Sequence, residues 1–108
     1  MMNTHQQITF AENLIQKMSN DNRFQSLKPY VKDLAIKLDE WQIAIANAQN
    51  GGKIKTIKKI EKGLSVKDKV FYLAAQVEIM AEHNQELITA SGYKKQRKEV
   101  NLLSLIHI

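Results

Sequence analysis

Residues 27–49, LKPYVKDLAIKLDEWQIAIANAQ, decide the fold of this chain. Their apolar side chains recur alternately four and three residues apart, which places them on one face of an α-helix. A single helix cannot bury such a face by itself, so the other segments must supply the remaining walls of a core. The residues of this face are Leu27, Val31, Leu34, Leu38, Trp41, Ile45 and Ala48.

This central helix has signals at both of its ends. It should begin between Ser26 and Pro29, because proline is tolerated in the first turn of a helix. It should close at Gly51, which can adopt the left-handed conformation of a C-terminal cap. Ile36 and Ile43 widen its apolar face, which predicts contacts on two sides.

A shorter amphipathic helix precedes the central one. The hydroxyl of Thr4 can cap its first turn while Gln7 reaches back, and Thr9 with Glu12 offers a later start. The helix should end at residues 19–22, because their short polar side chains compete for backbone hydrogen bonds.

The segment 53–83 contains two apolar stripes that are out of phase on one straight helix. Two structures can resolve the conflict. In the first, Gly63 ends one helix and Ser65 caps the next. In the second, one long helix exposes its early isoleucines or uses them against a different partner. The first stripe is Ile54, Ile57, Ile60 and Leu64, and the second is Val66, Val70, Leu73, Val77 and Met80.

A last short helix follows Asn84 and stops at Ser91 and Gly92, where glycine again suits the C-terminal cap. Tyr93 should pack back on its last turn, and Phe24 should plug one end of the core. The fold class is therefore all-α, a small and mainly antiparallel bundle of three or four helices spanning residues 5–93. At its centre we expect Leu34, Leu38, Trp41, Ile45, Val70, Leu73 and Val77.

Length and composition limit the class of protein. The 108 residues suffice for one domain, and the absence of cysteine removes disulfides and thiolate metal sites. The first ten residues lack the features of a secretory signal, and no apolar run approaches the length of about 18 residues that a membrane-spanning helix needs. We expect no membrane partner and a cytoplasmic or virion-associated location.

The net charge of +5 lies entirely in the second half of the chain, where residues 51–108 hold 11 basic and 6 acidic side chains. The lysines early in this half alternate with isoleucines, and together they form the candidate interaction surface, Lys53, Ile54, Lys55, Ile57, Lys58, Lys59 and Lys62. A solvated helix face, a phosphate-binding stripe and a docking face for a protein are three interpretations of it. A second basic patch comprises Lys94, Lys95, Arg97 and Lys98.

Residues suited to catalysis or metal binding are sparse. His5 and His83 lack metal-ligand spacing, and His83 is better explained as a residue at a helix end. The carboxylates of Glu78, Glu82 and Glu86 have helical spacing, which favours a solvated face over a cation site. No phosphate-binding loop or nucleophile elbow is present. We therefore predict a protein that is not an enzyme and has no catalytic, metal-binding or cofactor-binding residues.

The order of motifs resembles a family of bacterial proteins. In that family a small helical module precedes a fibronectin type III-like β-sandwich. The likeness covers residues 24–98 and rests on the glycine turn at residues 51–52, a lysine-rich helix start, LAAQV at residues 73–77, and SGY with Lys94 and Lys95 behind it. The chain departs from the family pattern at Ile60 and at Gly63, which puts the family's continuous long helix in question here. The resemblance implies a structural or interaction module and no catalytic residues.

The last six residues, LSLIHI at positions 103–108, require a separate interpretation. Back-translated as ctg tct ctt ata cac atc, they match the end of a transposon adapter used to prepare DNA sequencing libraries. Our hypothesis is that they are translated adapter and that the chain is a truncated metagenomic fragment, with residues 94–102 as a basic linker. The alternative is a short apolar segment that docks on the bundle.

From these observations we predict a non-enzymatic structural or protein-interaction module. Its expected partner is another protein or a missing C-terminal domain, and a second copy of the chain is a further candidate. The rival hypothesis is nucleic-acid binding without sequence preference through Lys53–Lys62, because lysines neutralise phosphates. No aromatic side chain interleaves these lysines to stack on bases, which weighs against it.

Overall fold

The computed structural model describes residues 2–82 and 84–93. These residues form four α-helices and one 3-10 helix, with no strand among them. The prediction of an all-α fold is therefore confirmed. In chain order the elements are α1 (Thr4–Ser19), η1 (Asn22–Leu27), α2 (Lys28–Ala48), α3 (Lys53–Ala81) and α4 (Gln85–Ser91).

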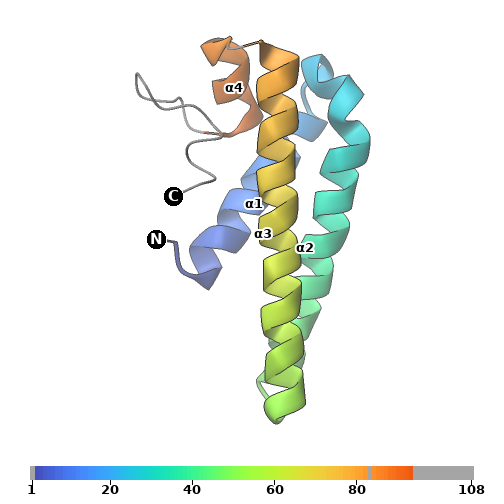
Figure 1. The fold of residues 1–108 in the computed structure, drawn as a ribbon, viewed down its shortest axis with the longest axis vertical. Coiled ribbons are helices and arrows are strands. Elements are labelled where there is room, and N and C mark those ends of the chain that lie inside the picture. Colours follow the sequence, from blue (N-terminus) through green and yellow to red (C-terminus); the bar gives the residue numbers. More distant parts are fainter. Residues whose placement is uncertain (1, 83, 94–108) are drawn as a thin grey trace.

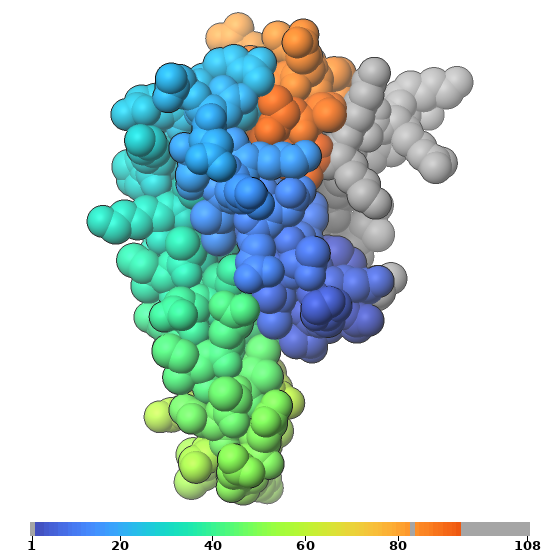
Figure 2. All heavy atoms as spheres, turned by 180° about the vertical axis from the view of Figure 1, so that it is seen from behind, coloured from blue at the N-terminus to red at the C-terminus, as the bar shows by residue number. Residues whose placement is uncertain are grey.

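The molecule is built on one long antiparallel hairpin of α2 and α3, as Figure 1 shows. Helix α1 packs obliquely across this hairpin, and α4 lies beside the end of α3. The opposite end of the hairpin forms the narrow lower part of the molecule in Figure 2. We call residues 43–62 the hairpin tip. It consists of α2 and α3, and α1 reaches only its inner end, where Thr4 and Gln7 share a groove with Lys59 and Ile60.

The hydrophobic core ends before the hairpin tip. Leu34 and Val77 are fully enclosed, whereas no side chain between Gln42 and Ser65 is buried. Ile45 and Val70, predicted at the centre, are only partly buried at its edge. The buried apolar residues are Ala11, Leu14, Met18, Phe24, Leu27, Val31, Leu34, Leu38, Trp41, Val66, Leu73, Ala74, Val77, Ala81, Ile88 and Tyr93.

Helix α2 is contacted by both α1 and α3. The two isoleucines from which contacts on two sides were predicted, Ile36 and Ile43, do not make these contacts. Ile36 and Ile43 are 47% and 54% exposed. They lie seven residues apart and thus share one face of the helix, and that face points away from the core stripe. The prediction that these two isoleucines widen the buried face is wrong.

Helix α1 begins one residue earlier than predicted. The side chain of Asn3 accepts a hydrogen bond from the backbone N–H of Gln6 at 2.8 Å, and Gln6 Oε1 accepts one from the N–H of Asn3 at 2.9 Å. This reciprocal pair is a capping box, so the cap assigned to Thr4 and Gln7 is incorrect. Asn3 and Gln6 are three residues apart, as a capping box requires, and this pair lies one position before the predicted pair of Thr4 and Gln7.

The connection from α1 to α2 is a short 3-10 helix, η1. Asp21 begins it by accepting a hydrogen bond from the N–H of Arg23 at 3.0 Å. The ring of Phe24 is fully buried, which confirms that it closes this end of the core. Pro29 then lies in the first turn of α2, as predicted.

Helix α3 is continuous over 29 residues, which excludes the first of the two alternatives, a break at Gly63 with a cap at Ser65. The out-of-phase stripes are resolved by the second alternative: Ile54, Ile57 and Ile60 stay exposed. Gly63 has a packing role instead. A Cβ added there would lie 2.9 Å from Nε1 of Trp41, so only glycine lets α3 approach the indole ring this closely.

The turn between α2 and α3 differs from the predicted one. Helix α2 ends at Ala48, and Gly51 has no left-handed conformation, since Gly92 is the only glycine with a positive φ among the described residues. A Cβ on Gly51 would instead collide with the side chain of Lys55. Gly51 thus provides space for a lysine that lies across the turn.

The last helix confirms its predicted ends. Asn84 caps α4 by accepting from the N–H of Glu86 at 3.0 Å, and Gly92 is left-handed with φ 106°. Tyr93 is buried and packs edge-to-face on Phe10, and its hydroxyl donates a hydrogen bond to the carbonyl of Val70 at 2.7 Å. One side chain therefore ties the end of α4 to both α1 and α3.

Candidate interaction surface

All seven residues of the predicted interaction surface lie in the first ten residues of α3, on the hairpin tip. Four of the five lysines lie on a different side of the helix from the isoleucines, and Lys53, seven residues before Ile60, shares the isoleucine side. Lys55, Lys59 and Lys62 are on the side that meets α2, since they line grooves together with α2 residues. Ile54 and Ile57 line neither of these grooves, and helical periodicity places them on another side of α3.

The isoleucines continue into Leu64 and form an exposed row that we call the aliphatic stripe. Their exposed fractions are 74% for Ile54, 46% for Ile57, 56% for Ile60 and 56% for Leu64. A single exposed aliphatic side chain is ordinary, but four on one helix at helical spacing form a contiguous apolar face. No described part of the chain buries this face.

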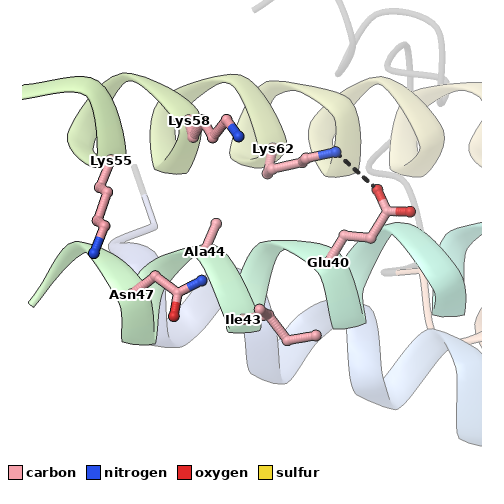
Figure 3. Close-up of a pocket in the computed structure, with 7 residues that line it drawn as sticks. All are labelled: Glu40, Ile43, Ala44, Asn47, Lys55, Lys58 and Lys62. Carbon is pink, nitrogen blue, oxygen red and sulfur yellow. Dashed lines mark hydrogen bonds and ion pairs between the residues drawn. The ribbon is translucent and has the colours of Figure 1, made fainter. Parts of the chain in front are cut away.

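A groove of about 320 Å³ follows the junction of α2 and α3 at the hairpin tip. We call it the seam groove, and Figure 3 shows its lining. Helix α2 contributes mainly apolar or uncharged side chains and α3 contributes only lysines. The lining residues are Glu40, Ile43, Ala44 and Asn47 from α2, and Lys55, Lys58 and Lys62 from α3.

Only one of the three seam lysines is neutralised. Lys62 Nζ lies 3.2 Å from Glu40 Oε1, and Lys37 approaches the same carboxylate at 3.9 Å. Within the described residues no ion pair involves Lys55 or Lys58, nor Lys53 or Lys59 on the same helix. The groove is thus positively charged beside an apolar wall formed by Ile43 and Ala44.

The position of Lys55 is set by the turn. Its aliphatic stem lies against Gly51, and Figure 3 shows the side chain reaching from α3 toward Asn47 of α2. A cation at the end of α2 is favourable because the last carbonyl groups of a helix carry partial negative charge. Lys55 therefore has a structural role in the turn as well as a place in the groove.

A second groove lies on the other side of the hairpin, where α1 begins. It has a volume of about 500 Å³ and brings Ile60 and Leu64 of the aliphatic stripe next to Trp41. Thr4 and Gln7 of α1 form its far wall, and Lys59 and Lys67 flank it. The aliphatic stripe therefore runs into a depression at its inner end.

The rest of the described chain shows no constellation suited to catalysis. No three His, Cys, Asp or Glu residues cluster for a metal within it, and His5 is exposed on α1. The acidic row is broken because α3 ends at Ala81 and Glu82 adopts φ 49°, so Glu78, Glu82 and Glu86 do not share one helical face. His83 and the second basic patch, Lys94, Lys95, Arg97 and Lys98, lie outside the described residues.

The shifted pKa values belong to two ion pairs and to one buried tyrosine. A hydrogen bond from Lys69 lowers the pKa of Asp33, and one from Arg23 lowers the pKa of Asp21. Burial raises the pKa of Tyr93. None of these groups lines the seam groove or the second groove. The pKa shifts therefore result from surface ion pairs and from burial of Tyr93, and they do not mark a binding groove.

The prediction from sequence missed three contributors. Ile43 of α2 was assigned to the buried face, and Leu64 was not included with the lysine and isoleucine set. The signal for Ile43 was its position out of phase with the stripe that contains Trp41 and Ile45. Glu40, the partner of Lys62, has no sequence signal because the two residues are joined only by the folding of the hairpin.

No family model, curated protein sequence or solved structure matches this chain. The resemblance to the helical module that precedes a fibronectin type III-like domain therefore stays a prediction. In the described part of the chain, no helix combines the length and the apolar character that crossing a membrane requires. The proposal of a function accordingly rests on the surface of the hairpin tip.

Proposed function

We propose that this chain is a non-enzymatic protein-interaction module that docks a partner on its hairpin tip. The observation that carries the proposal is the aliphatic stripe, whose Ile54, Ile57 and Ile60 are 74%, 46% and 56% exposed. Covering apolar surface is the main source of affinity in protein association. Four exposed aliphatic side chains that the fold does not need for its own core are suited to that role.

The shape of the hairpin tip supports the same function. A helix that projects beyond its bundle can be approached along its length, and helix-in-groove recognition uses apolar anchors three and four residues apart. Ile54, Ile57, Ile60 and Leu64 have this spacing. The second groove, at the inner end of the stripe, can receive an anchor side chain from the partner.

Selection from a library of displayed amphipathic helices on the immobilised full chain tests this proposal. We expect enriched helices whose binding is lost in the variant Ile57→Glu/Ile60→Glu, because a carboxylate on the stripe opposes apolar contact. The matched control is Ile36→Glu/Ile79→Glu, which changes two exposed isoleucines outside the hairpin tip. Failure to enrich any helix, or enrichment of helices that bind both variants equally, would refute the proposal.

A second candidate function is nucleic-acid binding without sequence preference. It is favoured by Lys53, Lys55, Lys58 and Lys59, which have no ion-pair partner among the described residues. Gel shifts with arbitrary duplex DNA at low and high salt test it, since binding through lysine and phosphate weakens steeply with salt. An absence of any shift at low salt would eliminate this candidate.

A further inference from the structure

The seam groove combines two kinds of surface that suit one class of ligand. Its α2 wall exposes Ile43, which is 54% accessible, next to Ala44. Its α3 wall carries Lys55 and Lys58, whose charges no described carboxylate neutralises. A ligand complementary to both walls has to be apolar on one side and acidic on the other.

The spacing of the lysines matches a helix in the ligand. Lys55, Lys58 and Lys62 are three and four residues apart, which places them in one row about 10 Å long. Carboxylates three and four residues apart on a partner helix have the same repeat. In Figure 3 this row runs parallel to α2, with Lys55 at one end and the Lys62 pair with Glu40 at the other.

Charge argues against a second copy of the chain as the occupant. The first fifteen residues of α3, 53–67, carry six lysines and one glutamate, so pairing two hairpin tips would bring two positive rows together. Nucleic acid would pair with the lysines and leave the side chain of Ile43 in water. An acidic protein helix satisfies both the charged and the apolar groups.

We propose that the seam groove binds an acidic amphipathic helix of a partner protein. The helix lies along the junction of α2 and α3, with apolar residues on Ile43 and Ala44 and carboxylates at Lys55 and Lys58. This inference rests on the proposed docking function of the hairpin tip and specifies the chemistry of the partner.

Three synthetic helices test the inference. They share one apolar face and carry glutamate, glutamine or lysine on the polar face, and fluorescence anisotropy measures their binding to the full chain at 50 and 500 mM NaCl. We expect the glutamate helix to bind about tenfold tighter than the glutamine helix at low salt. This advantage should shrink at high salt because exposed ion pairs are screened.

Charge reversal locates the site. In the variant Lys55→Glu/Lys58→Glu we expect the preference to invert, so that the lysine helix binds more tightly than the glutamate helix. The control Lys17→Glu/Lys32→Glu changes the net charge equally at exposed lysines of α1 and α2 and should keep the original preference. Circular dichroism confirms that both variants remain folded.

Each other outcome is decisive. If the three helices bind equally well and Ile57→Glu/Ile60→Glu abolishes binding, the acidic preference is refuted and the docking function stands. If none of the helices binds, the inference and the docking proposal both fail. A preference for glutamate that persists in Lys55→Glu/Lys58→Glu places the acidic site elsewhere. Self-association of the chain in analytical ultracentrifugation would assign the groove to a second copy.

Discussion

Gly63 lies directly against the indole ring of Trp41. A methyl group on Gly63 would come within 2.9 Å of Nε1 and 3.0 Å of Cε2 of that ring. Trp41 is 5% exposed and is the last buried residue of α2 before the hairpin tip. The contact therefore marks the place where the core ends and the two-helix part of the molecule begins.

We expect Gly63→Ala to destabilise the protein in spite of the better helix propensity of alanine. The propensity gain is about 1 kcal/mol, whereas forcing atoms into a packed contact costs about 1–3 kcal/mol. In a Trp41→Phe background the smaller ring leaves room, and the same change should become stabilising. Chemical denaturation of the four proteins gives the coupling energy. Equal effects of Gly63→Ala in both backgrounds would show that the indole does not limit this position.

The capping box at Asn3 predicts which substitution weakens the start of α1. Asn3→Ala should lower the free energy of unfolding by about 1 kcal/mol, because it leaves the N–H of Gln6 without its acceptor. Thr4→Ala is the matched control and should have a smaller effect, since Thr4 is exposed and is not the cap. Thermal unfolding of both variants decides between the observed cap and the one expected from sequence.

Tyr93 predicts a specific dependence of stability on alkaline pH. Burial raises the pKa of its hydroxyl, so above pH 10 the unfolded chain loses this proton while the folded chain retains it. Stability therefore falls as pH rises above about 10, and Tyr93→Phe should lose less stability between pH 9 and 11 than the native chain. At neutral pH the same variant should be less stable by about 0.5–1.5 kcal/mol, because its hydrogen bond to Val70 is gone.

The control for this experiment is Tyr72→Phe. The ring of Tyr72 is half exposed and stacks edge-to-face on Tyr30, a contact that phenylalanine retains. This variant tests whether the alkaline effect is specific to Tyr93. Parallel curves for Tyr93→Phe and the native chain would contradict the assignment of the alkaline loss to Tyr93.

The exposure of the aliphatic stripe predicts that its residues contribute little to folding. Ile57→Gln/Ile60→Gln should change the free energy of unfolding by about 0.5 kcal/mol per site or less, as is usual for exposed positions. Leu73→Ala, further along the same helix and 1% exposed, should cost about 2–5 kcal/mol. Urea titrations of the two variants provide the measurement. A large loss in the glutamine variant would mean that the stripe is packed in the folded chain.

The sequence predicted the helices well because their apolar periodicity is strong. Leu34, Leu38 and Trp41 are buried as their spacing requires, and Gly92 caps α4 as its position after Ser91 suggests. The sequence left a break at Gly63 open because glycine can either end a helix or allow close approach of another side chain, and only the position of Trp41 distinguishes the two roles.

The sequence indicated the α3 residues of the candidate surface but not its α2 residues. The alternation of lysine and isoleucine in α3 located it, since that pattern lies within one helix. The contributions of α2 could not be found in this way. Ile43 and Glu40 join the surface only because α2 pairs with α3 in the folded chain. An isoleucine such as Ile43 also gives no sign in the sequence of whether it faces the core or a partner.

The continuity of α3 gives the molecule a gradient of local stability. Residues 66–81 are held by the core through Val66, Leu73 and Val77, whereas residues 53–65 contain no buried side chain. Amide protons in residues 54–62 should therefore exchange with solvent sooner than those in residues 70–80, although all belong to one helix. A ligand that supplies the missing third wall should slow exchange at the hairpin tip and leave the rates near Val77 unchanged. Residue-resolved hydrogen exchange would thus report occupancy of the tip without any change in the fold.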